Sequence, residues 1–144
     1  HGSNHTTTPI FIHIPKTGGS SIEEAFRKKG MRVGKYGFYK KPKEQWPYKP
    51  SHISHRCRST WHIPPDKFVP RSFCVVRDPY DRMISQYNMQ LYHSKTLHYN
   101  ETTCSCGYFA KWFEDRRRRM QDNPWISDCH FVSQATYAKT CKKV

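Results

Sequence analysis

The 144-residue sequence has little leucine, little acidic charge and no long apolar run. Because no stretch approaches the ~18 apolar residues of a membrane span, and no signal-peptide core occurs, these residues hold no transmembrane segment. Two leucines and seven glycines exclude a coiled coil and a collagen. Leu, Ile, Val and Phe total only 24 residues, a share that favours disorder when net charge is high. The 15% aromatic content instead predicts a folded core.

Acidic residues are outnumbered by basic ones, 11 to 25, which gives a net charge of +14. A field of that sign attracts polyanions such as nucleic acids, anionic polysaccharides and nucleotide phosphates. The imbalance is concentrated between Arg27 and Arg58, where eleven Lys or Arg residues accompany one acid, Glu44. Interleaved aromatic residues suit a sugar chain there, and equally a single-stranded nucleic acid. A second cluster, Arg116–Arg119, is interpreted as a solvated helix face.

Six cysteines and two Asn-x-Thr sequences, at Asn4 and Asn100, together indicate a glycoprotein of the secretory pathway with disulfides. We expect Cys129 to pair with Cys141, and Cys57 to pair with Cys104 or Cys106. The spacing of the thiols does not match a zinc finger. The opening His-Gly-Ser is interpreted as a tag remnant, and we expect that a natural targeting segment or membrane anchor has been removed from this chain.

A buried strand, a tight turn and a helix are predicted near the start of the chain. Pro9-Ile-Phe-Ile-His-Ile14 is a short apolar run typical of a buried strand. Pro15-Lys-Thr-Gly-Gly-Ser-Ser21 forms the turn, and apolar residues recur at helical spacing from Ile22. Ser20 and Glu23 stand three residues apart, which predicts a capping box at the start of the helix.

A second strand and helix are predicted over residues 72–92. Ser72-Phe-Cys-Val-Val-Arg77 is the strand, Asp78 is a suitable N-cap, and Pro79 suits the first helical position. The apolar stripe of this helix comprises Met83, Ile84, Tyr87 and Leu91.

A third helix is predicted from about Tyr108 to Met120, with Phe109, Trp112 and Phe113 facing inward. Residues 30–71 are expected to be irregular apart from a short strand near His52. Strands that alternate with helices imply a parallel α/β sheet. We expect one domain over residues 9–144, after a tag remnant and a disordered lead-in over residues 1–8.

The turn at residues 15–21 is suited to hold an anion. Gly18 and Gly19 let backbone N–H groups approach closely, Ser20 and Ser21 add hydroxyl donors, and the following helix start favours negative charge. Lys16 brings a mobile cation. A Walker A loop places its lysine after the glycines, whereas Lys16 precedes them.

The segment Pro15-Lys16-Thr17-Gly18-Gly19-Ser20-Ser21 resembles the 5′-phosphosulfate loop of the sulfotransferases. Arg77-Asp-Pro-Tyr-Asp-Arg-Met-Ile-Ser85 resembles the 3′-phosphate motif of that family, an Arg that ends a strand and a Ser eight residues later. The resemblance covers residues 9–92 and is closest to the Golgi carbohydrate (glycosaminoglycan-type) sulfotransferases, whose first motif often reads as residues 13–19 do here. Cys129-His-Phe-Val-Ser-Gln134 is similar to a later His-x-x-x-Gln segment of the same group.

This resemblance implies a P-loop-kinase-like parallel sheet flanked by helices, and sulfuryl transfer from 3′-phosphoadenosine 5′-phosphosulfate (PAPS). Such a transfer depends on in-line positioning and charge stabilisation. We expect Arg77 and Ser85 to hold the 3′-phosphate. The charge that grows on the 5′-phosphate is expected to be received by Lys16 and by the donors of Thr17, Gly18, Gly19, Ser20 and Ser21. No metal is expected, because a sulfuryl group carries less charge than a terminal phosphoryl group. Arg82 is expected to brace the helix or neighbouring carboxylates.

The acceptor hydroxyl needs a general base, for which histidine is the natural choice. His52, His55 and His62 lie between the two motifs, where related glycosaminoglycan sulfotransferases carry a catalytic histidine. His52 is the expected base and His55 the alternative, with a carboxylate of Glu23 or Glu24 as a further possibility.

Two more histidines stand near the motifs: we expect His13 to be buried beneath the loop and His130 to line the cleft. The chain ends early for this family, so the domain is expected to be small or incomplete, with Cys141-Lys-Lys-Val144 beginning a further strand.

The expected acceptor is an anionic polysaccharide or glycan rather than a nucleic acid, and the expected location is the Golgi lumen, natively as a type II membrane protein. Two other functions stay open: a P-loop nucleotide kinase, which the position of Lys16 disfavours, and a non-catalytic module that binds heparin-like polyanions.

Overall fold

A computed structural model of the chain describes residues 8–51, 57–94, 100 and 102–142. Its centre is a parallel pair of strands, β1 (Ile10–Phe11) and β2 (Ser72–Phe73), with Ile10 opposite Ser72 and Phe11 opposite Phe73. The predicted parallel pairing of these two segments is confirmed, and the chain is a small mixed α/β protein. Both strands are shorter than predicted, and in the described part of the chain the sheet has only these two strands. The short strand expected near His52 falls on residues 52–56, outside the described ranges.

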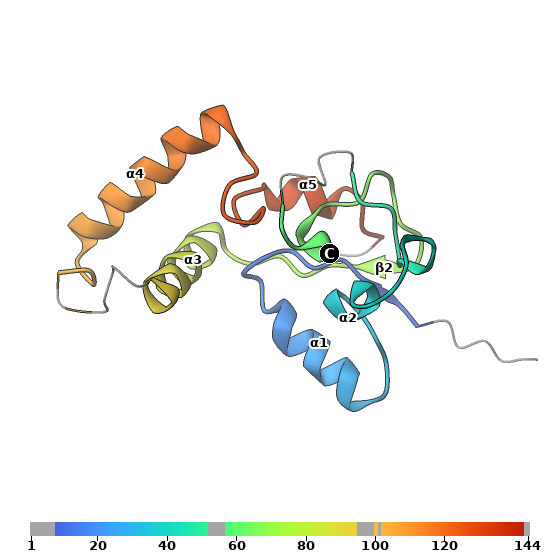
Figure 1. Ribbon diagram of the computed structural model, residues 1–144. Helices are drawn as coiled ribbons and strands as arrows, with labels where there is room; N and C mark the ends of the chain where they lie inside the picture. Colours follow the sequence, from blue (N-terminus) through green and yellow to red (C-terminus); the bar gives the residue numbers. More distant parts are fainter. Residues whose placement is uncertain (1–7, 52–56, 95–99, 101, 143–144) are drawn as a thin grey trace, which may run out of the picture.

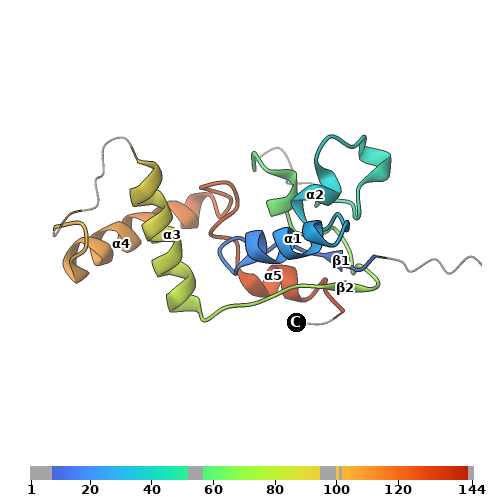
Figure 2. The same cartoon turned by 90° about the horizontal axis from the view of Figure 1, so that it is seen from below.

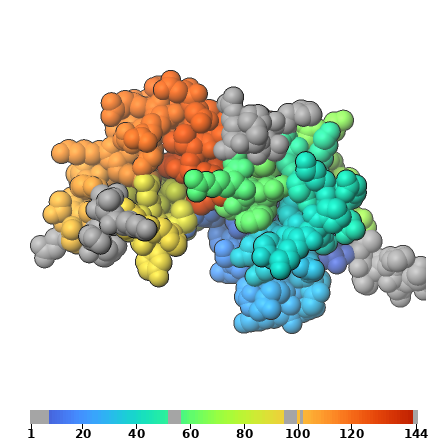
Figure 3. Space-filling view, in the orientation of Figure 1, coloured from blue at the N-terminus to red at the C-terminus, as the bar shows by residue number. Residues whose placement is uncertain are grey.

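Helices lie on both sides of the strand pair (Figure 1). Helix α1 (Gly19–Lys28) lies on one side and α5 (Gln134–Ala138) on the other, while α3 (Pro79–His93) and α4 (Cys106–Asp122) form a separate pair beside them, as Figure 2 also shows. The connecting segment, expected to be irregular, contains the short helix α2 (Lys35–Phe38) and the 3₁₀ helices η1 (Lys43–Gln45) and η3 (Thr60–His62). In Figure 3 a notch opens between the yellow atoms of α3 and the blue atoms from near the start of the chain.

Aromatic side chains contribute to both buried clusters of the core, although the sequence has only two leucines. One buried cluster surrounds the strands and includes Tyr137, which has no exposed surface. A second cluster joins α3 to α4 through Tyr87, Leu91, Trp112 and Phe131. Burying an aromatic side chain stabilises a fold by roughly 1.5–3 kcal/mol. These rings therefore take the place of the missing aliphatic residues.

Two predicted inward positions are wrong. Ile84 is 46% exposed and Phe113 is 38% exposed. Met83, Tyr87 and Leu91 follow one another at four-residue spacing along the buried face of α3, and Ile84 lies one residue further round the helix, towards solvent. On α4 the buried ring is Trp112, and Phe113 packs only at the margin.

The two helix starts differ in how they are capped. Asp78 caps α3 as predicted, since its carboxylate accepts from the backbone N–H of Tyr80 and Asp81 at 2.9 and 3.1 Å. The capping box predicted for α1 is wrong, because α1 has Gly18 as its N-cap with no side-chain cap. Glu23 is instead turned into the protein.

The cysteine pairing also differs from the prediction. Disulfides join Cys57 to Cys129 and Cys74 to Cys141, with Cα–Cα distances of 5.6 and 6.2 Å. The expected Cys129–Cys141 pair is wrong, and the expected partners of Cys57, the thiols 104 and 106, are free and exposed. The described C-terminal residues form no strand; instead they are tied to the segment after β2. No helix within the described ranges has the length and apolarity that crossing a membrane requires.

Candidate active site

A cleft of about 420 Å³ brings the two sequence motifs together. This volume lies in the range of small-molecule sites, roughly 300–1,000 Å³. Of the residues predicted to bind the donor, those that line it are Lys16, Gly18, Gly19, Ser20, Ser21, Arg77 and Ser85. Motifs about 60 residues apart in sequence therefore face one space, because β1 and β2 are neighbouring parallel strands whose carboxyl ends meet at the same edge.

The loop after β1 presents backbone donors to this cleft. Gly18 has φ +88°, and Lys16 has φ +67°, a left-handed conformation that lysine rarely adopts. The first helical hydrogen bonds of α1 are donated by Ser21 and Ile22 to the carbonyl of Gly18. The N–H groups of residues 19 and 20 therefore lie outside the hydrogen bonding of the helix, at its positive end. Thr17 differs: its side chain is buried and its hydroxyl donates to the carbonyl of Ile14 at 2.9 Å, so any contact with an anion there would use its backbone.

His13 and Glu23 support the loop from below. A Cβ on Gly19 would lie 2.6 Å from Cε1 of His13, so only glycine fits above this ring. His13 is buried, as predicted, and its Nδ1 lies 2.7 Å from Oε1 of Glu23. The same carboxylate accepts from the backbone N–H of Lys35 at 2.8 Å. Glu23 is thus fully buried and does not line the cleft, and Glu24 is bound to Arg27 at the surface. The structure therefore does not support either carboxylate as the base.

Two cations of the cleft stand without acidic partners. Partial burial, and secondarily the positive charge of Arg77, lowers the pKa of Lys16. No carboxylate of the described residues forms an ion pair with Lys16 or Arg77. Like charges held close together in a partly buried cleft are stabilised by an anion that binds between them. The electrostatics of the cleft therefore suit a multiply charged anionic ligand.

The backbone at Arg77 is held by a residue of the late His-x-x-x-Gln segment. The N–H of Arg77 donates to Oε1 of Gln134, and Nε2 of Gln134 donates back to the carbonyl of Arg77, both at 2.8 Å. This pair fixes the end of the strand segment and leaves the guanidinium exposed. Gln134 therefore positions Arg77, which the sequence pattern alone did not show.

Arg82 is a structural brace, as expected, but its partners are carbonyls rather than carboxylates. Its buried guanidinium donates to the carbonyl oxygens of Pro15, His130 and Val132 at 2.9, 2.7 and 3.1 Å. Burial lowers the pKa of Arg82. The side chain joins the anion loop to the segment before α5 and does not line the cleft.

Three histidines also line the cleft, namely His13, His62 and His130. His62 and His130 both face it, with ring centroids 4.8 Å apart. His130 Nδ1 lies 2.7 Å from Oε1 of Gln86. Burial, with a smaller effect of His62, lowers the pKa of His130 to about 3, so this ring is neutral at neutral pH and is a poor base. His52 and His55 lie outside the described residues, so their predicted roles stay predictions.

His62 has a partner that sequence reasoning missed. Its Nδ1 lies 3.0 Å from Oδ2 of Asp128, 66 residues further along the chain. No local spacing signals such a pair. Within the described ranges, His62, Asp128 and His130 also place potential metal-ligand atoms within 4.8 Å of one another. Each is already hydrogen bonded, and the neighbouring Lys16 disfavours a cation, so the expectation of a metal-free site stays a prediction.

Comparison with curated proteins and with solved structures gave no match. The chain does match the family model described as "Sulfotransferase family", over residues 4–143. The match spans nearly the whole chain and both segments that meet in the cleft. The chain therefore belongs to the sulfotransferase family.

Proposed function

We propose that this chain transfers a sulfuryl group from PAPS to a hydroxyl of an anionic carbohydrate, at a site of P-loop-kinase-like design. The observation that carries the proposal is the single cleft in which the glycine loop with Lys16 faces Arg77 and Ser85. PAPS has anionic groups at two ends of one adenosine, and these two sets of donors suit those two ends.

In this proposal the 5′-phosphosulfate lies against Lys16 and the N–H groups at the start of α1. These donors stabilise the negative charge that develops on the bridging oxygen as the S–O bond to the 5′-phosphate breaks. Arg77 and Ser85 hold the 3′-phosphate, the group that distinguishes PAPS from ATP. The spent carrier leaves as 3′-phosphoadenosine 5′-phosphate.

His62 is the best-placed base among the described residues. It lines the cleft, and its Nδ1 is engaged by Asp128, which leaves Nε2 to accept the proton of the acceptor hydroxyl. The acceptor oxygen forms the new bond to sulfur while the bond from sulfur to the 5′-phosphate oxygen breaks. His52 and His55, predicted from the pattern between the motifs, remain rivals for the same role.

The acceptor is proposed from charge and from aromatic side chains. Lys35 and Trp61 line the same cleft. Lys35 belongs to the basic segment from Arg27 to Arg58, and Trp61 follows that segment closely in the sequence. Rings of this kind stack on sugars and cations hold their anionic groups. Two disulfides favour an oxidising compartment, which supports the proposed Golgi lumen, where a type II membrane anchor would hold the native protein.

The test is transfer of labelled sulfate from PAPS to desulfated glycosaminoglycans, with tyrosine peptides as a contrasting acceptor class. We expect a glycosaminoglycan to be sulfated, and Lys16→Ala to lower turnover by at least ~100-fold. Turnover of magnesium-ATP, with PAPS inert, would replace the proposal by a nucleotide kinase. Heparin binding with no use of either nucleotide would replace it by a polyanion-binding module.

The base is tested by three separate variants, His62→Ala, His52→Ala and His55→Ala. We expect the first to lower kcat by ~100-fold and the others to retain most of it, since a positioned acid–base group contributes roughly 10²–10⁴-fold. If His62→Ala keeps full activity and either His52→Ala or His55→Ala is inactive, the histidine replaced in the inactive variant is the base instead.

A further inference from the structure

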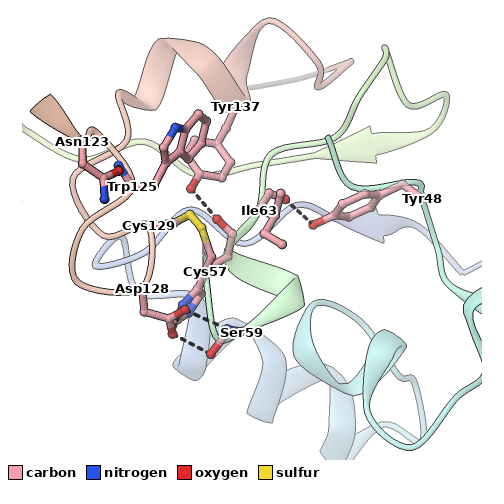
Figure 4. The surroundings of a disulfide bond; sticks show 10 residues. Tyr48, Cys57, Ser59, Ile63, Asn123, Trp125, Asp128, Cys129 and Tyr137 are labelled. Atoms are coloured by element: carbon pink, nitrogen blue, oxygen red, sulfur yellow. Dashed lines mark hydrogen bonds and ion pairs between the residues drawn. A yellow bond between two sulfur atoms is a disulfide. The ribbon is translucent and has the colours of Figure 1, made fainter. Parts of the chain in front are cut away.

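The segment before η3 is fastened to the loop before α5 by a disulfide and two hydrogen bonds (Figure 4). Cys57 is bonded to Cys129 across 72 residues of sequence. Ser59 donates its backbone N–H to Oδ1 of Asp128 at 2.7 Å and its hydroxyl to Oδ2 at 2.6 Å. The hydroxyl of Tyr137 in α5 adds a hydrogen bond to the carbonyl of residue 62 at 2.6 Å. The short helix η3 is therefore held at both ends.

The carboxylate of Asp128 also determines the state of the His62 ring. Burial alone would raise the pKa of Asp128, but hydrogen bonds from His62 and Ser59 outweigh it and hold that pKa well below its usual range. The carboxylate is thus ionised at neutral pH and can only accept hydrogen bonds. Because Nδ1 of His62 lies 3.0 Å from it, the ring proton lies on Nδ1 and the lone pair lies on Nε2.

The loop that carries Asp128 has an unfavourable backbone. Ser127, Asp128 and Cys129 have φ values of +53°, +59° and +65°, in a region that residues other than glycine, asparagine and aspartate rarely occupy. Such a conformation persists only where surrounding contacts fix it. Here those contacts are the disulfide at Cys129 and the hydrogen bonds that Asp128 accepts.

We propose that Asp128 is a positioning residue for sulfuryl transfer, and that the Cys57–Cys129 disulfide maintains the loop in which it acts. The inference rests on the proposed function, with His62 as the base. Asp128 keeps Nε2 of His62 as the nitrogen that receives the proton, and its charge stabilises the imidazolium that results. Transfer therefore depends on the oxidised state of one cysteine pair.

Asp128→Asn tests the positioning role, because asparagine has the same shape and tolerates a left-handed backbone. We expect kcat to fall ~10–100-fold, as for the loss of partners that orient catalytic or metal-bound groups, with KM for PAPS unchanged. The variant leaves in place the other titratable and charged groups on or behind the cleft walls, which are His13, Lys16, Glu23, Lys35, Arg77 and His130.

The disulfide is tested against a matched control in the same chain. The pair Cys57→Ser with Cys129→Ser removes a 72-residue link, and the pair Cys74→Ser with Cys141→Ser removes one of 67 residues, so the two deletions free similar lengths of unfolded chain. We expect both pairs to lower thermal stability similarly. The first should also lower kcat about tenfold or more in the folded protein, since small misplacements of a reacting group can cost ~100-fold. The second should leave kcat within about twofold, because neither of its cysteines lines the cleft.

The outcomes separate the inference from the proposed function. A wild-type chain that transfers no sulfate, or a fully active His62→Ala variant, would overturn the proposed function or its base, and the inference with it. Loss of activity in His62→Ala, with unchanged kcat in Asp128→Asn, would overturn the inference alone. Nitrogen-15 NMR of His62 reads the tautomer without turnover. The proton should lie on Nδ1 in the wild type and redistribute in Asp128→Asn, and an identical spectrum in both would contradict the positioning role.

Discussion

Arg77 is predicted to read the 3′-phosphate of the donor, and a nucleotide pair isolates that contact. Adenosine 3′,5′-bisphosphate and 5′-AMP differ only in this phosphate, so the ratio of their dissociation constants measures its recognition. The guanidinium is exposed, while its backbone is fixed by Gln134 through two 2.8 Å hydrogen bonds. A hydrogen bond to a charged group contributes roughly 1.5–3 kcal/mol, and the exposure of Arg77 favours the lower half of that range. We therefore expect Arg77→Ala to reduce the ratio by ~10–30-fold.

Titration calorimetry at fixed ionic strength measures the four affinities. Arg118→Ala is the control, because it removes the same charge from an exposed position on α4 and should leave the ratio unchanged. Ser85→Ala removes a neutral donor and should reduce the ratio only ~3–10-fold. If Arg77→Ala lowers the affinity for both nucleotides equally, the reasoning is refuted. Arg77 would then attract anionic nucleotides in general rather than bind the 3′-phosphate.

Two further predictions concern stability. Arg82→Met should lower the free energy of unfolding by ~3–5 kcal/mol in urea titrations, because three buried carbonyls lose their donor. Arg82→Lys should recover only part of this loss, because one ammonium group cannot reach all three carbonyls. An unchanged free energy of unfolding in Arg82→Met would show that these hydrogen bonds are not needed. The pKa of His130 is about 3 in the folded protein and ordinarily near 6.5, so the unfolded chain binds the additional proton as pH falls below about 6.5. Stability should therefore fall by about 2 kcal/mol from pH 7 to pH 5, and His130→Gln should flatten this dependence; an equal slope in the variant would contradict the assignment.

The loop of residues 15–21 that lines the cleft was predictable because an anion-binding loop is built from local structure. An anion loop needs glycines, a cation and the start of a helix within a few residues, and residues 15–21 show all of these. Asp78 capped its helix as expected, for the same local reason. In contrast, Glu23 has the spacing of a capping residue, yet it lies inside the protein against His13 and Lys35. The buried hydrogen bonds of Glu23 with His13 and Lys35 therefore outweigh the local preference for a capping box.

The pairing of His62 with Asp128 could not be predicted, because the two residues lie 66 positions apart in the sequence. A histidine's reactivity depends on which group engages its other ring nitrogen, and that group can lie anywhere in the chain. The pattern between the motifs favoured His52 and His55, but only the fold shows that Asp128 accompanies His62. The pairing of Cys57 was missed for the same reason, since it depends on which loop the fold places beside it. The two omissions are linked: Cys129 and Asp128 are adjacent residues of one loop, so the contact that determines the cysteine pairing also brings the Asp128 carboxylate to His62.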